Sequence, residues 1–506
     1  MTKKMKTEMY MKLQNGSDIR GIAVAGVEGE NVNLTPEIAK NIGAAFADFL
    51  HEKKGAAYEE IRIGVGHDSR ISAGILQEGV TGGMASKGCT VLDCGLTSTP
   101  SMFMSTVLEG FEYTGAVMIT ASHLPYNRNG LKLFTSEGGL ESRDIKVILA
   151  KAAEYAANDW EAPAYTAEKA DLVGAYTAHM QKLIKEDVNA ENYEKPLEGL
   201  HIVVDASNGV GGYFVNVLEP LGASVEGSIC LDPDGMFPNH VPNPENKQAM
   251  EFIRSAVLKE KADLGIIFDT DGDRAAVVFS DGEEVNKNSI IALMAAILSE
   301  KYPNTTVVTD SVTSDHLTTY LEGIGMVHHR FKRGYKNVIN EAIRLNAEGV
   351  ETHLAIETSG HGAVKENYFL DDGAYMSVRI VCTLAKCRRE GKQIADLIAS
   401  LKKPAESTEI RMKIGVEDFK AYGNQVLDDF REFVKTSDLF EMVEKNFEGV
   451  RVNYNDGEVT GWMLIRLSLH DPVIPMNFES DMVGGVDKIW KVAQEFLSKY
   501  DALSRG

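Results

Sequence analysis

The segment "ADLGIIFDTDGD", residues 262–273, contains the pattern that decides the fold class. An apolar run of strand length leads directly into a loop that holds three aspartates. Strands that are apolar along their whole length occur in parallel or mixed sheets with helices on both faces. Similar strand-like segments recur at residues 61–66, 89–95, 115–122, 200–209, 305–311 and 353–362. Since helix-like stretches such as 101–109 and 145–157 alternate with them, the sequence predicts an α/β fold.

The 506 residues are too many for one ordinary core and correspond to roughly three or four domains. Three of the predicted strands end in reactive loops, at Ser122, at Asp269 and at Glu357. The last hundred residues instead combine a hairpin around Asn455 with a helix over 485–500. Together with polar linkers, this predicts α/β domains at 1–190, 191–303 and 304–404 and a smaller α+β domain at 405–506.

Composition excludes several classes of partner. The formal charge of −22 repels nucleic acids and anionic membranes, although a small anion responds only to its own pocket. The longest apolar run, residues 290–298, is too short to cross a bilayer. Five cysteines without a CxxC pair disfavour a disulfide framework and a zinc site, and together with the lack of a secretory signal they favour a reducing compartment. We therefore expect a cytoplasmic protein.

The acidic loop is the strongest candidate for a metal site. Asp269, Asp271 and Asp273 alternate along "FDTDGDR", residues 268–274, and three carboxylates so close repel one another unless a cation lies between them. Hard oxygen ligands favour Mg²⁺. The competing interpretation is a solvated acidic turn. An EF-hand is excluded because Gly272 occupies the fourth loop position and Ser280 replaces the bidentate glutamate.

The segment "TASHLPYNRNGLKLF", residues 120–134, follows another predicted strand. Ser122 can project its hydroxyl from the turn, while His123 and Lys132 supply donors or a proton carrier. A serine hydrolase is disfavoured because GxSxG is absent and adjacent Ser and His rarely align. Taken alone, the segment would be interpreted as an ordinary polar loop.

Other loops contribute candidates for sugar and phosphate binding. In "IETSGHG", residues 356–362, Glu357 and Ser359 suit sugar hydroxyls and His361 suits proton transfer. Arg20 in "SDIRG" suits a phosphate, whereas Arg70 in "GHDSR" is expected in surface ion pairs. "RFKRGYKNV", residues 330–338, forms a basic island from Arg330, Lys332, Arg333 and Lys336. Arg466, Ser468 and His470 alternate in "RLSLHDP" and either bind phosphate or belong to a half-exposed strand.

Taken in order, the motifs "SDIRG", "TASHLPYNRNGLK", "DPDGMFPNHVPNP", "DTDGDR", "RGYKNV" and "ETSGH" resemble those of the α-D-phosphohexomutase superfamily, the phosphoglucomutase/phosphomannomutase enzymes. The resemblance spans nearly the whole chain, and several motifs in one order are far more specific than any single one. It implies three similar mixed α/β domains and a smaller C-terminal α+β domain around a central cleft.

The resemblance also implies roles for the candidate residues. Ser122 would be the phosphoserine, and Asp269, Asp271 and Asp273 would bind Mg²⁺ with an oxygen of its phosphate. Glu357 and Ser359 would bind sugar hydroxyls, and the Arg466 loop the distal phosphate. The transferring group would be surrounded by Arg20, His123, Lys132, Arg274 and His361, with Lys132 or His361 as proton carrier. Substrate binding would also involve Lys332, Arg333, Lys336, Ser468 and His470.

Three motifs depart from the family pattern, and one of them is the family's GRD, which is Gly66-His67-Asp68 here. The family often has HNP where this chain has His123-Leu124-Pro125, and RxSGTEP where it has Leu469, His470 and Asp471 after Ser468. We expect a Mg²⁺-dependent mutase that interconverts the 1- and 6-phosphates of glucose, mannose or both, with glucose 1,6-bisphosphate as intermediate and activator. Alternatives are phosphoglucosamine as substrate, a phosphatase with Asp269 as nucleophile, and a non-catalytic sugar-phosphate binder. The sequence leaves the oligomeric state open.

Overall fold

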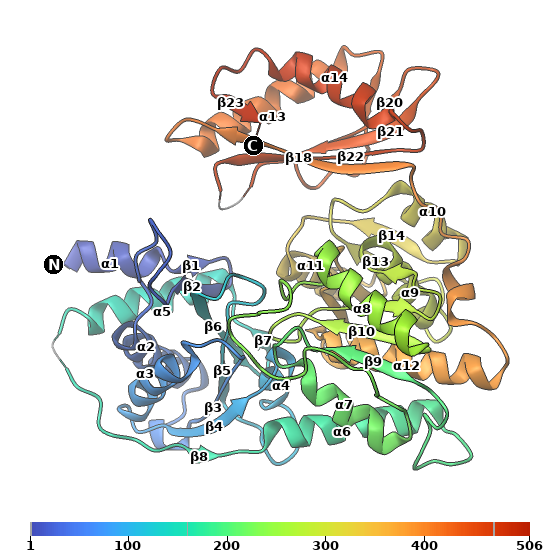
Figure 1. Cartoon of the computed structure of the whole chain (residues 1–506). Coiled ribbons are helices and arrows are strands. Elements are labelled where there is room, and N and C mark those ends of the chain that lie inside the picture. Colours follow the sequence, from blue (N-terminus) through green and yellow to red (C-terminus); the bar gives the residue numbers. More distant parts are fainter. Residues whose placement is uncertain (1–2, 159, 469–470, 506) are drawn as a thin grey trace. The chain divides into compact units, whose positions relative to one another are not determined.

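The computed structural model describes residues 3–158, 160–468 and 471–505 (Figure 1). The chain divides into two compact units. Unit 1 comprises Met1–Asn286 and Ser359–Asp396, and unit 2 comprises Lys287–Thr358 and Leu397–Gly506. No helix in the described ranges combines the length and the apolar character that crossing a membrane requires.

The first sheet of unit 1 holds the Ser122 loop. Its strand order is β1-β2-β6-β5-β3-β4-β8, with β7 paired to β6. The strands are β1 (Gln14–Asn15), β2 (Asp18–Ile22), β3 (Arg62–His67), β4 (Thr90–Leu96), β5 (Gly115–Ile119), β6 (Arg128–Thr135), β7 (Gly138–Gly139) and β8 (Glu168–Lys169). Because β3 pairs parallel with β4 and β5 whereas β5 pairs antiparallel with β6, the sheet is mixed. The loop between β5 and β6 carries Ser122.

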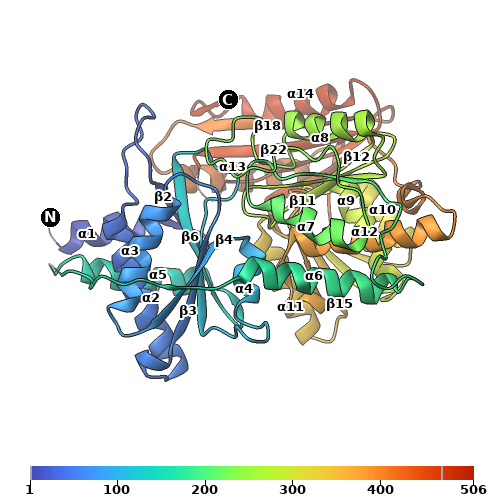
Figure 2. The ribbon, with the colours of Figure 1, turned by 60° about the horizontal axis from the view of Figure 1, so that its bottom comes forward.

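Helices cover both faces of this sheet. They are α1 (Lys3–Met11), α2 (Pro36–Lys54), α3 (Ala73–Ala85), α4 (Thr99–Met104), α5 (Ser142–Tyr155) and α6 (Leu172–Val188). Figure 2 shows α2 and α3 on one face and α4 on the other. The axes of α2 and α3 approach closely at glycines, since a Cβ on Gly43 would lie 2.2 Å from the Val80 carbonyl oxygen and one on Gly83 would lie 2.0 Å from that of Lys40.

The second sheet of unit 1 holds the acidic loop. Its order is β12-β11-β10-β9, formed by β9 (Ile202–Asp205), β10 (Leu264–Phe268), β11 (Ala275–Phe279) and β12 (Glu284–Val285). All residues of β10 and β11 are buried, as the apolar run predicts. β10 pairs antiparallel with β11, so residues 269–274 form the tight connection of a hairpin. Outside the two sheets, unit 1 also contains the helices α7 (Phe214–Leu218), α8 (Lys247–Glu260) and α12 (Gly373–Arg389). It further contains the strands β16 (Gly362–Val364) and β17 (Leu370–Asp371), which pair antiparallel with each other.

Unit 2 contains a parallel sheet and an antiparallel sheet. The parallel strands β14 (Val327–Arg330), β13 (Thr306–Thr309) and β15 (Thr352–Ile356) pair in that order, with helices α9 (Lys287–Ser299), α10 (Asp315–Gly323) and α11 (Tyr335–Ala347). The antiparallel order is β19-β20-β21-β22-β18-β23. Its strands are β18 (Glu406–Ile414), β19 (Phe440–Met442), β20 (Val450–Asn455), β21 (Thr460–Ile465), β22 (Val473–Ser480) and β23 (Leu503–Arg505). Both α13 (Phe419–Lys435) and α14 (Gly485–Leu497) cover one face of it (Figure 1).

Short 3-10 helices complete the described structure: η1 (Tyr58–Glu60), η2 (Gly211–Tyr213), η3 (Glu219–Leu221), η4 (Lys365–Asn367) and η5 (Ile394–Ile398). The predicted α/β class and the hairpin around Asn455 are confirmed, since β20 pairs antiparallel with β21. Element ends differ by a few residues. The helix predicted over 101–109 is α4, which starts earlier because the Ser98 hydroxyl caps it by accepting from Ser101 N, and Pro100 fits its first turn.

Candidate active site

The loop after β5 turns sharply at Ser122. The residue has φ of 51°, a conformation that non-glycine residues adopt rarely and often at functional positions. Its backbone N donates to Thr120 Oγ1 at 2.8 Å. The hydroxyl donates to Asp269 Oδ2 at 3.1 Å and accepts from Arg274 Nη2 at 3.0 Å. The turn therefore directs the hydroxyl at the acidic loop, 147 residues further along the chain.

A single buried guanidinium holds the shape of this loop. Arg70 is 2% exposed and donates to the carbonyl oxygens of four loop residues: Ser122, Leu124 at 2.6 Å, Pro125 at 2.8 Å and Arg128 at 3.0 Å. The expectation that Arg70 forms surface ion pairs is wrong. The planar Arg70 guanidinium has five N–H donors, so it can donate hydrogen bonds to carbonyl oxygens that have no strand partner in the turn.

The acidic loop presents three buried carboxylates on a tight hairpin. Asp269 Oδ1 accepts from the backbone N of Gly272 at 3.0 Å, and Gly272 has the φ of 74° that this turn requires. One oxygen from each of Asp269, Asp271 and Asp273 lies within 4.8 Å of the others. Asp271 Oδ1 and Asp273 Oδ1 are buried without a hydrogen-bond partner. Unsatisfied buried carboxylate oxygens are costly, and a hard divalent cation is the ligand that would satisfy them.

Charges in the acidic loop are uneven. Burial and the neighbouring Asp273 raise the pKa of Asp269 to about 8. Burial opposes ionisation of Asp271 too, but the Lys132 ammonium and a Thr99 hydrogen bond outweigh it and lower the pKa of Asp271. Lys132, on β6 and 4% exposed, donates from Nζ to Asp271 Oδ2 at 3.0 Å and to Asp273 Oδ2. The lysine thus carries part of the positive charge that the loop needs.

Two histidines border the loop in opposite charge states. Burial and the adjacent Arg274 lower the pKa of His123 to about 2, so its Nδ1 accepts from Arg274 Nη2 at 2.5 Å. Burial also disfavours charge on His361, but Asp371 and Asp273 raise its pKa to about 9. His361 Nδ1 pairs with Asp371 Oδ2 and lies 3.8 Å from Asp273 Oδ1. His361 is therefore a proton donor near neutral pH, whereas His123 is an acceptor.

The sequence did not indicate two residues of this cluster. Asp371, at the end of β17, partners His361, and Thr99, the first residue of α4, donates to Asp271. The aspartate pair "DD" at 371–372 after an apolar stretch was the available signal for the first. Arg20 lies in the same unit on β2, where it donates to Thr120 O at 2.6 Å and to Asp18 Oδ2 at 2.7 Å.

In unit 2, two of the basic candidates, Arg333 and Arg466, lie close to each other. Burial and the nearby Arg333 guanidinium lower the pKa of Arg466, and its Nε is buried without a partner. Arg333 N donates to Glu448 Oε2 at 3.1 Å. The carboxylates of Glu448 and Glu409 favour the charge of Arg466, and Glu409 Oε2 lies 3.8 Å from its Nη2.

The other candidates for sugar and phosphate binding lie on separate segments of the chain. Glu357, which follows β15, accepts from Gly334 N at 2.6 Å and so contacts the basic segment. Ser468 Oγ accepts from Asp471 N at 3.2 Å. Lys332 is exposed and Lys336 lies half-buried in the first turn of α11. Ser359 belongs to unit 1 and is 8% exposed, and His470 lies outside the described residues.

Comparisons with known proteins place this chain in one family. Family models described as phosphoglucomutase/phosphomannomutase, alpha/beta/alpha domains I, II and III match residues 11–159, 175–282 and 286–404. A phosphomannomutase/phosphoglucomutase of Pseudomonas aeruginosa is 29% identical over 489 residues, which cover 96% of both chains. A phosphoglucomutase/phosphomannomutase of Thermococcus kodakarensis is 30% identical over 476 residues, covering 92% of this chain and 93% of the relative.

Solved structures agree in fold. A phosphoglucomutase/phosphomannomutase family protein of Burkholderia thailandensis superposes with a TM-score of 0.77 at 25% identity, covering 97% of this chain and 98% of the other. The expected three similar α/β domains followed by a further C-terminal domain, here built on an antiparallel sheet, are thereby confirmed. The chain belongs to the phosphoglucomutase/phosphomannomutase family, enzymes that transfer a phosphoryl group within a sugar.

Proposed function

We propose that the protein interconverts hexose 1-phosphates and hexose 6-phosphates of glucose and mannose through a phosphoserine at Ser122 and a hexose 1,6-bisphosphate. One observation carries this proposal: the Ser122 hydroxyl lies within hydrogen-bond distance of both Asp269 and Arg274. A hydroxyl placed between a candidate metal ligand and a guanidinium suits phosphoryl transfer, which depends on positioning and charge stabilisation.

Asp269, Asp271 and Asp273 would hold Mg²⁺ together with an oxygen of the Ser122 phosphate. The all-oxygen donor set and the two unsatisfied oxygens of Asp271 and Asp273 fit this ion. When bound, Mg²⁺ would neutralise charge on the phosphoryl oxygens and make phosphorus a better electrophile.

In the first transfer, the free hydroxyl oxygen of the sugar phosphate bonds to phosphorus as the P–O bond to Ser122 breaks. The hydroxyl proton ends on Ser122 Oγ, so no other reactant is consumed. We assign this proton relay to His361 with Asp371, because their buried pair holds a proton beside Asp273. Lys132, Arg274 and Arg20 would stabilise charge on the transferring group, and His123 would keep the Arg274 guanidinium in place.

The resulting bisphosphate then turns, so that its other phosphate returns to Ser122. Arg466, Arg333 and Ser468 would bind the phosphate that is not being transferred, with Lys332, Lys336 and His470 adding donors. Glu357 and Ser359 would bind the sugar hydroxyls. The unsatisfied Nε of Arg466 supports this assignment. Escape of the bisphosphate leaves the serine unphosphorylated, which is why glucose 1,6-bisphosphate would activate the enzyme.

The decisive experiment compares Ser122→Ala with Ser136→Ala, a control at a serine just after β6. Conversion of glucose 1-phosphate is followed with Mg²⁺ and a catalytic amount of glucose 1,6-bisphosphate, and intact mass reports phosphate on the protein. We expect Ser122→Ala to lose both turnover and phosphate, and Ser136→Ala to retain both. Turnover by Ser122→Ala, or release of inorganic phosphate with the phosphate on Asp269, would favour the phosphatase alternative.

Substrate preference needs a separate measurement. Values of kcat/KM for the 1-phosphates of glucose, mannose and glucosamine rank the three substrates directly. We expect glucose and mannose to exceed glucosamine by at least about tenfold, a difference of about 1.4 kcal/mol in transition-state binding. The opposite ranking would identify a phosphoglucosamine mutase and leave the role of Ser122 unchanged.

A further inference from the structure

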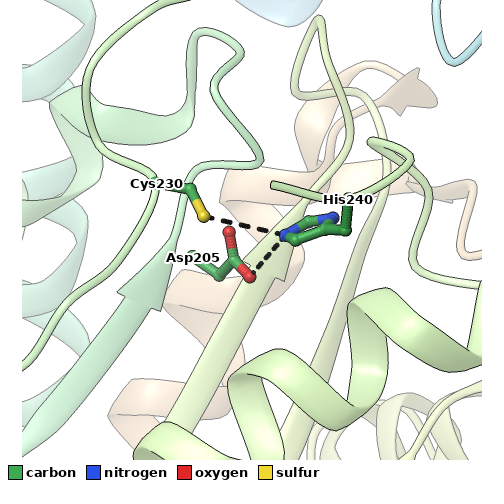
Figure 3. Close-up of side chains that lie close together, drawn as sticks. All are labelled: Asp205, Cys230 and His240. Atoms are coloured by element: carbon green, nitrogen blue, oxygen red, sulfur yellow. Dashed lines mark hydrogen bonds and ion pairs between the residues drawn. The ribbon is translucent and has the colours of Figure 1, made fainter. Parts of the chain in front are cut away.

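A second cluster of metal-ligating side chains lies elsewhere in unit 1 (Figure 3). Asp205 is the last residue of β9. Cys230 directly follows Ile229, which forms an isolated β-bridge with Asp205. His240 lies in the "DPDGMFPNHVPNP" motif. The side chains of Asp205 and His240 are 0% exposed, and Cys230 is half-buried. None of the three residues has a role in the proposed phosphoryl transfer.

The three ligand atoms converge on one point. His240 Nε2 lies 2.9 Å from Asp205 Oδ2 and 3.8 Å from Cys230 Sγ, and all three atoms lie within 4.8 Å of one another. Figure 3 shows both contacts meeting at the same ring nitrogen. A nucleophilic Cys–His–Asp triad has a different geometry, because there the carboxylate binds the other nitrogen.

The hydrogen bond at the far side of the ring bears on what lies between His240 Nε2 and Asp205. His240 Nδ1 lies 3.0 Å from the Val241 carbonyl oxygen, which can only accept, so Nδ1 carries the hydrogen. A neutral ring would then direct its Nε2 lone pair at the Asp205 carboxylate. Repulsion between two acceptors at 2.9 Å is relieved only by a positive charge between them, either a second proton or a metal ion.

We propose that Asp205, Cys230 and His240 form a site for Zn²⁺ or a similar thiophilic divalent metal. Zinc bonds of about 2.0–2.3 Å at tetrahedral angles separate ligand atoms by roughly 3.4–3.6 Å. The separations of 2.9 and 3.8 Å in the structure reach these values with shifts of about half an ångström. A solvent molecule would complete the site on the half-buried side of Cys230.

The surrounding bonds match those of known zinc sites. Zinc-bound histidines donate their other ring N–H to a carbonyl or carboxylate, as Nδ1 of His240 does. The second carboxylate oxygen, Asp205 Oδ1, accepts from Ser207 N at 2.8 Å and is thereby oriented. A thiolate and an imidazole favour zinc, cobalt or copper over Mg²⁺, so this site and the all-oxygen acidic loop would select different metals. The metal would fasten the segments at Cys230 and His240 to the end of β9.

Cobalt titration tests the proposal, because Co²⁺ bound to a thiolate gives a sulfur-to-metal charge-transfer absorption that an all-oxygen site cannot give. The full-length protein, reduced and freed of metal, is titrated with Co²⁺ alone and then with Zn²⁺. We expect the band to saturate at one Co²⁺ per chain and to disappear as Zn²⁺ displaces the probe. Zn²⁺ should also raise the Tm of the wild type, since a ligand bound only by the folded state stabilises it.

Four variants locate the site. Cys230→Ser and His240→Gln should each lose the band and the Tm shift, and Cys387→Ser, which removes another half-buried thiol, should retain both. Asp271→Asn should also retain the band, which separates this site from the acidic loop and from the proposed mutase function. No band in folded wild type, or an unchanged band in Cys230→Ser, would show that the cation is only a proton. If Cys230→Ser fails to fold, His240→Gln decides by the same criterion.

Discussion

At the scale of single residues, Arg70 determines the geometry of the loop that carries Ser122. Its guanidinium binds four carbonyls of that loop, and the ammonium of a lysine cannot bind all four. We predict that Arg70→Lys lowers kcat by about 10–100-fold with a smaller change in KM, because a displacement of about 1 Å at the reacting atom costs this much. Steady-state kinetics and Tm are compared with those of Arg62→Lys, which changes an exposed arginine of β3. Wild-type kcat in folded Arg70→Lys would contradict the prediction.

From the contact between His361 and Asp371 we predict how kcat/KM depends on pH. Burial lowers the pKa of His361, but the Asp371 and Asp273 carboxylates outweigh it and raise the pKa to about 9, so the ring keeps its proton below that pH and loses it above. In Asp371→Asn the ring loses its proton at lower pH, and the alkaline limb of the kcat/KM profile should move to lower pH. The profile is measured with glucose 1-phosphate, and His361→Gln should lack the limb altogether. An unmoved limb in Asp371→Asn would assign it to another group, such as Lys132.

A functional residue could be predicted from the sequence only where the residues that indicate its role lie close to it along the chain. Ser122 and Asp269 follow apolar strands within a few residues, and the order of motifs along the chain supports both. Arg70 carries no such signal, since its burial results from a loop that begins 52 residues later. Asp371 was likewise missed, because its importance depends on a pairing across 10 residues and a turn.

At the scale of elements, the contact between α2 and α3 depends on glycines. A Cβ on Gly83 would lie 2.0 Å from a backbone carbonyl oxygen of α2, whereas one on Gly74, also in α3, meets nothing within 4 Å. We predict that Gly83→Ala destabilises unit 1 by about 1–3 kcal/mol through overpacking. Gly74→Ala should be neutral or stabilise it by up to about 1 kcal/mol through helix propensity. Urea unfolding measures both, and equal effects would show that α3 shifts freely.

The sequence located strands better than it located their ends. Apolar runs identify β3, β5, β10 and β13 because burial on both faces requires such residues. Where a strand ends depends on the hydrogen bonds of its partner, as at β5, which stops at Ile119 although the predicted strand segment extends to residue 122. The helix expected over 485–500 likewise ends at Leu497. Strand pairing is decided by atoms that a single segment does not contain.

At the scale of the whole molecule, unit 2 is held together by a buried arginine. Arg451 on β20 donates to Ser311 O at 3.0 Å and Asp315 Oδ1 at 2.9 Å, and its guanidinium lies 3.6 Å from the centroid of the Trp462 ring. We predict that Arg451→Gln destabilises unit 2 by about 1.5–3 kcal/mol, the range for hydrogen bonds of charged groups. Hydrogen exchange in α10 and β20 should accelerate together. Arg411→Gln, which removes an exposed ion pair with Glu409, should cost less than about 0.5 kcal/mol.

We also expect unit 2 to be less stable against unfolding in mild acid. Burial and the neighbouring Arg330 and Arg451 lower the pKa of His328 well below its usual value, and its ring contacts Thr309 Oγ1 and Thr318 Oγ1, each at 2.7 Å. Below about pH 6.5, His328 binds a proton in the unfolded chain but stays neutral in the folded one. The free energy of unfolding therefore falls by up to about 1.4 kcal/mol for each pH unit. Above that pH the ring is neutral in both states and contributes no slope. Urea unfolding between pH 5 and 7 should show a shallower decline in His328→Gln; equal slopes would exclude this histidine as the cause.

The hydrogen bonds from Arg70 to four carbonyl oxygens have a consequence for sequence divergence. The guanidinium contacts only main-chain oxygens in the loop, so it imposes the course of the backbone and ignores the identity of the residues there. Leu124 and Tyr126 are thus free to change without altering the position of the Ser122 hydroxyl. A library randomised at these two positions should therefore yield folded proteins that keep the wild-type kcat.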